Sequence, residues 1–183
     1  MDTEALGRKK IGRFFMRIMA AIMESRLRYK FFGPDKILEG SGIKKGMKVL
    51  EVGCGTGFFT INAAKIIGEN GRLISIDMSP LSVDMVAKKA EKADIKNVKV
   101  IKANAIDTKL ENSSFDEILI FGVIPAPMLP MNQLLSEMQR ILKQNGIMSV
   151  WPPSWVHSPI LKSGQFKYIG KKNGVRNYQR VDV

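Results

Sequence analysis

Short β-rich runs alternate with helical segments from residue 46 onward, and this alternation constrains the fold more than any other feature of the chain. Parallel strands that are joined through helices form right-handed crossovers, so the pattern predicts a doubly wound, mostly parallel α/β sheet. We expect strands at 48–52, 73–77, 98–101, 115–121 and 146–150, and helices at 58–67, 80–93 and 132–142.

The tail departs from this alternation. Residues 166–170 and 175–180 are both β-rich, and they flank Asn173 and Gly174, a pair that strongly favours a two-residue hairpin turn. An antiparallel hairpin is therefore expected after the parallel strands. Together these patterns predict one Rossmann-like domain over 46–183.

Residues 1–45 form a basic segment ahead of this domain. Over 11–29, Ile, Phe and Met recur at helical spacing on one face while Arg and Glu line the other, which indicates an amphipathic helix. Such a helix can close over a cofactor cleft as a lid. It can also lay its apolar face on a membrane surface through residues 8–30, with its cations at the headgroups. The pattern is compatible with both.

The formal net charge of +12 lies mainly in the two flanks, since residues 1–45 carry +6 and residues 156–183 carry +5. A basic flank can attract RNA, anionic lipid or an acidic small molecule, or can simply keep the surface solvated. Long apolar runs and a secretory leader pattern are absent from the sequence, and the single cysteine, Cys54, cannot form an internal disulfide. These features favour a cytoplasmic protein.

The site is expected at a glycine-rich turn between the first strand and the first helix. Residues 49–57 read Val-Leu-Glu-Val-Gly-Cys-Gly-Thr-Gly, a buried strand followed by glycines that let a ligand lie against bare backbone. The dinucleotide fingerprint would need a glycine at position 58, where Phe58 stands. A phosphate-cradling loop would need a following Gly-Lys-Ser/Thr, which is also missing.

Two carboxylates at neighbouring strand ends narrow the ligand class. Glu51 lies two residues before the first glycine. An acid there would repel a pyrophosphate but attract the amino group and sulfonium of S-adenosylmethionine (SAM). Asp77 ends the second expected strand, where a carboxylate can accept two hydrogen bonds from a ribose diol. Asp77 could instead cap the helix that follows Ser79, but beside Glu51 and the loop a cofactor role is favoured.

Taken in order, the motifs resemble the class I SAM-dependent methyltransferases, and among them the type 11 group that includes ubiquinone- and menaquinone-biosynthesis enzymes. The resemblance covers roughly residues 40–180, and its first motif is the most specific. It implies seven strands with the last one antiparallel, SAM as cofactor and S-adenosylhomocysteine as product; no metal site is expected. The matching stretches are 51–57, 76–79, 103–105, 114–118 and 140–146.

The resemblance also assigns cofactor contacts to the carboxyl ends of four strands. The methionine part of SAM would lie in the glycine loop, the ribose on the acid of the second strand, and the adenine between the next residue and the turn after the third strand. The methyl group and the acceptor would lie beside the end of the fourth strand. The residues in these four places are Glu51, Gly53, Cys54, Gly55, Thr56 and Gly57; Asp77 and Met78; Asn104 and Ala105; and Phe121 and Gly122.

The chain departs from the family pattern at two informative places. Asn104 stands where many members have Asp, although its carbonyl can also accept a hydrogen bond from an adenine amine. Residues 123–127 read Val-Ile-Pro-Ala-Pro rather than the Asp/Asn-Pro-Pro-Tyr/Phe of enzymes that methylate exocyclic amines of bases, which argues against such a target.

His157 is the only histidine and the candidate general base, in a loop near the expected carboxyl edge. Methyl transfer from a sulfonium often needs only positioning and desolvation, so a base is not required. The expected function is SAM-dependent methyl transfer to a small or lipid-like acceptor. An RNA methyltransferase that uses the basic flanks and a non-catalytic SAM-binding protein are the alternatives.

Overall fold

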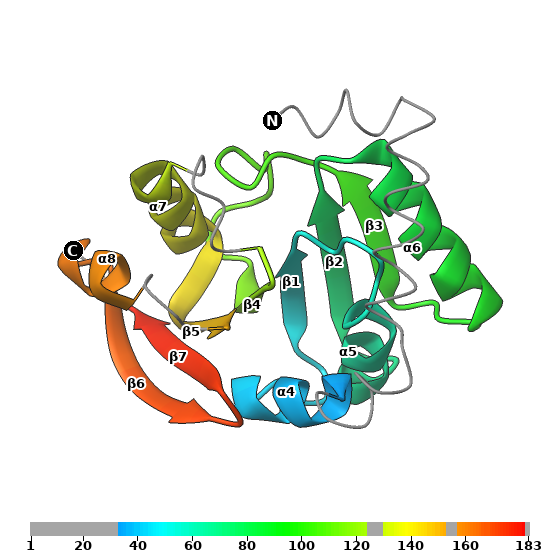
Figure 1. Cartoon of the computed structure of the whole chain (residues 1–183), viewed down its shortest axis with the longest axis horizontal. Coiled ribbons are helices and arrows are strands. Elements are labelled where there is room, and N and C mark those ends of the chain that lie inside the picture. Colours follow the sequence, from blue (N-terminus) through cyan, green and yellow to red (C-terminus); the bar gives the residue numbers. More distant parts are fainter. Residues whose placement is uncertain (1–32, 124–129, 153–156, 182–183) are drawn as a thin grey trace.

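The computed structural model describes residues 33–123, 130–152 and 157–181. One seven-stranded sheet runs through these residues in the order β3-β2-β1-β4-β5-β7-β6, from right to left in Figure 1. Its strands are β1 (Lys48–Val52), β2 (Arg72–Asp77), β3 (Val98–Lys102), β4 (Phe115–Phe121), β5 (Leu142–Trp151), β6 (Phe166–Lys172) and β7 (Val175–Arg180). The helices are α4 (Pro34–Ser41), α5 (Thr60–Ile67), α6 (Pro80–Lys92), α7 (Met131–Ile141) and α8 (His157–Lys162).

The predicted sheet and hairpin are confirmed. Strands β1 to β5 pair in parallel, whereas β7 pairs antiparallel with both β5 and β6. The hairpin turns at Asn173 and Gly174, whose φ angles of 50° and 82° are those a tight hairpin turn requires. Strand β1 lies between β2 and β4, where the chain order reverses. Open α/β sheets bind ligands outside the carboxyl ends of the strands at such a point.

Alternating side chains along the strands build a separate core on each face of the sheet. On one face Leu50, Ile74 and Ile118 pack with residues of α7 and α8. On the other face Val49 and Leu73 pack with residues of α4 and α5. Because both faces are covered, the strand ends are the part of the sheet that remains for binding.

Most element boundaries lie within one or two residues of the prediction, and the differences that bear on the site or the hairpin are these. Helix α5 begins at Thr60, two residues late, because Phe58 and Phe59 are buried in the preceding turn. Strand β5 begins at Leu142, directly after α7. The loop expected around His157 is wrong, since His157 begins α8; the proline two residues later is tolerated in a first helical turn.

The predicted amphipathic helix over 11–29 lies outside the described residues, so the boundary at residue 45 stays a prediction. Within 1–45, α4 packs on the C-terminal hairpin. The side-chain amide of Asn173 donates to the carbonyl of Lys36 at 2.7 Å, and that of Asn177 to the carbonyl of Gly40 at 3.0 Å. None of the helices in the described ranges is long and apolar enough to cross a membrane.

Candidate functional site

The glycine-rich turn connects β1 to α5 at the carboxyl edge of the sheet. Its glycines, Gly53, Gly55 and Gly57, have φ angles of 71°, 52° and 78°, in the left-handed region that favours glycine. A Cβ on Gly53 would lie 2.4 Å from Val123 Cγ2, so this position is closed by packing. Within residues 33–123, 130–152 and 157–181, a Cβ on Gly55 would meet no atom closer than 3.9 Å, so these residues leave its bare backbone open to a ligand.

Asp77, the last residue of β2, faces this turn. Its Oδ2 accepts a hydrogen bond from the Gly55 N–H at 2.9 Å, and its Oδ1 accepts one from the Ser79 N–H at 2.8 Å. The N-cap of α6 is Ser79, whose Oγ accepts from the Ser82 N–H at 3.4 Å. The half-buried carboxylate of Asp77 therefore joins the glycine turn to the start of α6, and it is not itself the helix cap.

Glu51 lies beneath the turn in a buried hydrogen-bond cluster. Its Oε2 accepts from the hydroxyls of Thr60 and Ser75, each at 2.7 Å. The pKa of Glu51 is raised to about 7. Burial is the main cause and the charge of Asp77 a smaller one, while the two hydroxyl hydrogen bonds act in the opposite direction. The two acids therefore share one electrostatic environment, but Glu51 also holds the start of α5 to β2.

Two other side chains of the turn are buried. Burial, followed by the charges of Glu51 and Asp77, raises the pKa of the Cys54 thiol, which makes it a packing residue rather than a nucleophile. Thr56 is also buried, and its Oγ1 has no hydrogen-bond partner among the residues that the structure describes. An unsatisfied buried hydroxyl is costly, so this atom points to a polar group of a ligand or to water.

Lys89 of α6 also holds the turn in place. Its Nζ donates to the carbonyl of Thr56 at 2.7 Å, and its Cδ would lie 3.7 Å from a Cβ on Gly57. Lys89, Thr60 and Ser75 were not among the residues predicted from the sequence. Only their spacing could have indicated them: Lys89 lies three residues after the buried Val86, so the two share one face of α6.

The expected adenine end is built from the ends of β2 and β3. Met78 follows Asp77 and is 44% exposed, which is high for a large apolar side chain beside a polar turn. The N–H of Ala103 donates to the carbonyl of Asp77 at 3.1 Å and ties the two strand ends together. Asn104 Oδ1 accepts from the Ile106 N–H at 3.2 Å, so this oxygen already serves the turn that contains Ala105. Its contact with adenine stays a prediction.

The end of β4 has one buried and one exposed residue. The ring of Phe121 packs edge-to-face on Phe59, with 5.1 Å between centroids, and so belongs to the core on the α5 side. Gly122 is exposed, and its N–H donates to the carbonyl of Trp151 at 2.7 Å. The segment 124–129 that follows lies outside the described residues.

His157 lies on the hairpin side of the sheet, where its contacts within the described part of the chain are with Tyr168 and Tyr178 rather than with the glycine turn. Its Nδ1 is 2.8 Å from the hydroxyl of Tyr178, and its ring is 5.0 Å from that of Tyr168. Tyr178 pairs with Met148, three residues before the end of β5. Among the described residues, acids, cysteine and histidine form no group of three that could hold a metal ion.

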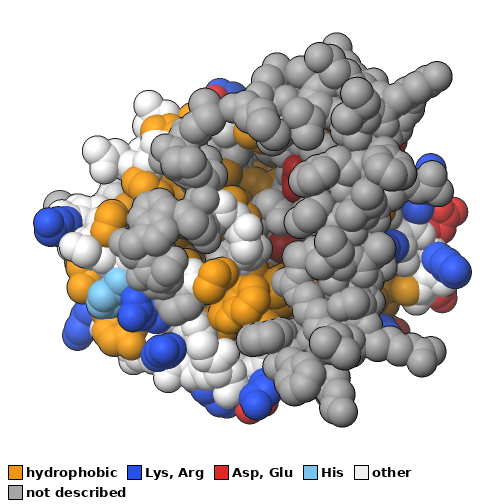
Figure 2. Space-filling view, in the orientation of Figure 1, with side chains coloured by type: hydrophobic (Ala, Val, Ile, Leu, Met, Phe, Trp, Pro, Cys, Tyr) orange, Lys and Arg blue, Asp and Glu red, His pale blue; other side chains and the backbone are white. Residues whose placement is uncertain are grey.

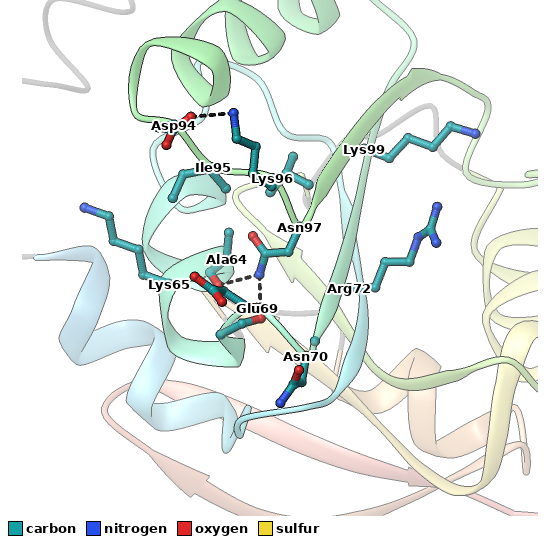
Figure 3. A pocket seen from close by; sticks show the side chains of 13 residues that line it. Ala64, Lys65, Glu69, Asn70, Arg72, Asp94, Ile95, Lys96, Asn97 and Lys99 are labelled. Atoms are coloured by element: carbon teal, nitrogen blue, oxygen red, sulfur yellow. Dashed lines mark hydrogen bonds and ion pairs between the residues drawn. The ribbon is translucent and has the colours of Figure 1, made fainter.

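A groove of about 870 Å³ lies at the opposite edge of the sheet, at the amino ends of β2 and β3 (Figure 3). Arg72 and Lys99 extend in the same direction from these neighbouring strands. Asn97 donates to the carbonyls of Ala64 and Gly68, each at 2.8 Å, and closes the inner side of the groove. The groove contains none of the predicted cofactor residues.

Comparison with known proteins agrees with this geometry. A family model described as a methyltransferase domain matches residues 43–174. A demethylmenaquinone methyltransferase from Staphylococcus aureus (strain MRSA252) is 34% identical over 128 residues, which cover 69% of this chain and 52% of that protein. The chain thus spans about half the length of the curated relatives it matches.

Solved structures share the fold. A SAM-dependent methyltransferase from Aquifex aeolicus superposes with a TM-score of 0.78 at 24% identity, over 90% of this chain and 98% of that one. A geranyl diphosphate C-methyltransferase from Streptomyces coelicolor A3(2) gives 0.66 at 15% identity, over 84% and 77%. The predicted Rossmann-like class is therefore confirmed. Since the family model covers most of the chain, this protein belongs to the methyltransferase-domain family, the class I SAM-dependent group that its motifs resemble.

Proposed function

We propose that this protein transfers the methyl group of SAM to a small, lipid-like acceptor of the quinone type and releases S-adenosylhomocysteine. One observation carries the proposal: the open backbone of Gly55 and the carboxylate of Asp77 lie together at the point where the strand order reverses. The acceptor class is supported by the demethylmenaquinone methyltransferase relative.

The residues at this edge fit SAM. The unsatisfied hydroxyl of Thr56 and the backbone of Gly55 offer polar partners for the methionine part. Asp77 would accept hydrogen bonds from the ribose hydroxyls, and the exposed side chain of Met78 would pack on the adenine. Glu51, whose pKa is already near neutral, would be held in its charged form by a neighbouring sulfonium.

When bound, SAM supplies a methyl group that is already activated for transfer. This chain would contribute binding, orientation and the exclusion of water, which is the kind of catalysis that needs no dedicated base. Gly122, the exposed residue at the end of β4, would border the acceptor. The hydrogen bond between His157 and Tyr178 gives His157 a structural role and makes it a poor base candidate.

A lipid-like acceptor places the reaction next to a membrane. The protein would work in the cytoplasm, and peripheral membrane contact through residues 8–30 would be one route to the acceptor. RNA remains the alternative target because of the basic flanks.

The test is incubation of the full chain with methyl-labelled SAM and either cell-extract fractions or a short-chain demethylmenaquinone. We expect label in the lipid fraction and in the quinone, and none with Asp77→Ala. Label in RNA would contradict the proposed acceptor class but would still support methyl transfer as the activity. Absence of both label and S-adenosylhomocysteine from every fraction would contradict the activity itself.

A further inference from the structure

We propose that the outer surface of α8 and β6 binds anionic lipid bilayers. We call this surface, made of Leu161, Lys162, Lys167, Tyr168, Ile169 and Lys171, the hairpin patch. Membrane binding by this patch would serve the lipid-like acceptor proposed above, and to that extent it rests on the proposed function. The binding itself does not require methyl transfer.

The hairpin patch exposes large apolar side chains. Of the four most exposed large hydrophobic residues in the described chain, three lie here: Leu161 is 40% exposed, Tyr168 37% and Ile169 46%. The fourth, Met78, follows Asp77 at the end of β2. Apolar side chains gathered on one surface mark an interaction site more often than scattered ones do.

The apolar residues lie on two elements that pack against each other, α8 and β6. His157 and Leu161 are four residues apart and share a face of α8. The ring of His157 packs against Tyr168 with 5.0 Å between centroids. Ile169 is the extra residue where the pairing of β6 with β7 shifts register, between Tyr168 and Gly170. Figure 2 shows hydrophobic side chains beside the pale-blue histidine, with Lys and Arg around them.

The charged residues of α8, β6 and β7 are all basic. Residues 157–181 contain six Lys or Arg and no Asp or Glu. Lys162, Lys167 and Lys171 are exposed and form no ion pair with any described residue, whereas Lys172 pairs with Glu39 at 2.9 Å. Three free ammonium groups around apolar side chains complement anionic headgroups above a hydrocarbon layer.

The structure favours a bilayer over other partners. Strand β6 ends the sheet order, but the irregularity at Ile169 and the lysines along it disfavour the addition of another strand. An RNA backbone would neutralise the lysines but leave Leu161 and Ile169 in water. A lipid interface accommodates both, because long basic side chains keep their charge at the headgroups while apolar neighbours enter the acyl region.

The experiment is co-sedimentation of the full chain with vesicles of phosphatidylcholine, alone or mixed with phosphatidylglycerol. We expect binding to the mixed vesicles that weakens with added salt, and little binding to the neutral ones. The variant Lys162→Gln/Lys167→Gln/Lys171→Gln should bind about 100-fold more weakly, since each basic residue near an anionic surface contributes about fivefold.

A matched control removes the same charge elsewhere. Lys65→Gln/Arg72→Gln/Lys99→Gln alters the groove of Figure 3, on the β2–β3 side of the sheet and several strands from β6. It should bind vesicles nearly as the wild type does. A second variant, Leu161→Ser/Ile169→Ser, should bind more weakly with its salt dependence unchanged. Thermal unfolding and SAM titration check that each variant is folded.

The proposal would be overturned if the wild-type protein did not sediment with mixed vesicles, if both triple variants lost binding equally, or if the protein bound transfer RNA in preference to vesicles. Self-association that Leu161→Ser/Ile169→Ser abolishes would also overturn it, because a second copy would then cover the patch. Vesicle binding without SAM binding would support this proposal while contradicting the proposed function.

Discussion

Single residues around the glycine turn combine structural and chemical roles. Asp77 bonds two backbone N–H groups, and Glu51 bonds two hydroxyls, so both acids hold the turn together. They differ in burial: Asp77 is half-buried, while Glu51 is buried and its pKa is raised to about 7. Near neutral pH Glu51 can therefore exchange its proton in response to a bound cation.

This property predicts a pH-dependent affinity for SAM. Below about pH 7 Glu51 is neutral, and above it the carboxylate is available to the sulfonium. SAM affinity should rise through this range, by about tenfold if SAM lowers the pKa by one unit. Titration calorimetry across this range measures it. S-adenosylhomocysteine, which lacks the sulfonium charge, and Glu51→Gln should both show flat profiles. Parallel profiles for the two ligands with the wild type would contradict a Glu51 contact.

A second buried acid, Glu117 in β4, has no place in the cofactor site. Burial raises its pKa to about 8, although the hydroxyls of Ser149 and Ser41 act in the opposite direction. Its Oε1 is 2.8 Å from Ser149 Oγ, which is 2.8 Å from Asn177 Oδ1. One hydroxyl proton cannot serve both oxygens. Protonated Glu117 donating to Ser149, which then donates to Asn177, satisfies the chain.

Glu117 should therefore make the protein less stable as the pH rises. Its contribution to stability is fully present below the unfolded pKa of about 4.5 and is lost as the pH rises through about 8. The loss should be on the order of a few kcal/mol. Thermal unfolding over this range should show Glu117→Gln gaining relative to the wild type toward alkaline pH. The exposed Glu91→Gln is the control and should follow the wild type; a parallel decline in Glu117→Gln would be inconsistent with this role.

At the scale of elements, the sequence predicted those with strong periodicity and missed those set by tertiary contacts. The start of β5 was missed because Lys143, Gln144 and Asn145 are polar and exposed, and Asn145 has a φ of 62°. The pairing of β5 with β4 is irregular there, so no alternation marks the strand. The hairpin was predictable because Asn-Gly specifies its own turn.

The position of the glycine-rich turn was predictable from the sequence, but the side chains that hold it in place were not. Glycine spacing and strand-end acids are local features, so the sequence identifies Gly53 and Asp77. The contacts of Lys89 with Thr56 and of Ser75 with Glu51 join residues 33 and 24 positions apart. Such contacts depend on how α6 and β2 lie against β1. A local sequence pattern does not show how distant elements pack.

The rigidity of the turn can be tested with two glycines. Gly53→Ala and Gly42→Ala both place a side chain at positive φ, which costs about 1 kcal/mol. Only the Cβ at position 53 meets another atom, Val123 Cγ2 at 2.4 Å, which should add about 1–3 kcal/mol and displace the turn. Urea unfolding and SAM titration should show that Gly53→Ala loses both stability and SAM affinity. Gly42→Ala should show only the smaller loss of stability. Equal behaviour would mean that Val123 yields freely.

At the scale of the whole molecule, the two ends of the sheet carry different features. The β3-β2-β1-β4 half brings the predicted cofactor residues together at its carboxyl edge, and the hairpin half presents basic and apolar side chains at its outer surface. The strand ends that would bind SAM belong to β1, β2 and β3, and β1 and β2 lie inside the sheet, so the bound ligand would contact strands that also build the core.

Binding of SAM should consequently stabilise the entire domain. At 100 times its dissociation constant, a ligand that binds only the folded state adds about 2.7 kcal/mol. For a chain of this length that raises the unfolding temperature by roughly 5–10 °C. Differential scanning fluorimetry with SAM and S-adenosylhomocysteine measures the shift. Asp77→Ala should lose most of it, whereas Asp84→Ala, an exposed acid on α6, should keep it. A full shift in Asp77→Ala would contradict the assigned contact between Asp77 and the ribose. If neither ligand shifted the unfolding temperature of the wild type, the proposed SAM site would be wrong.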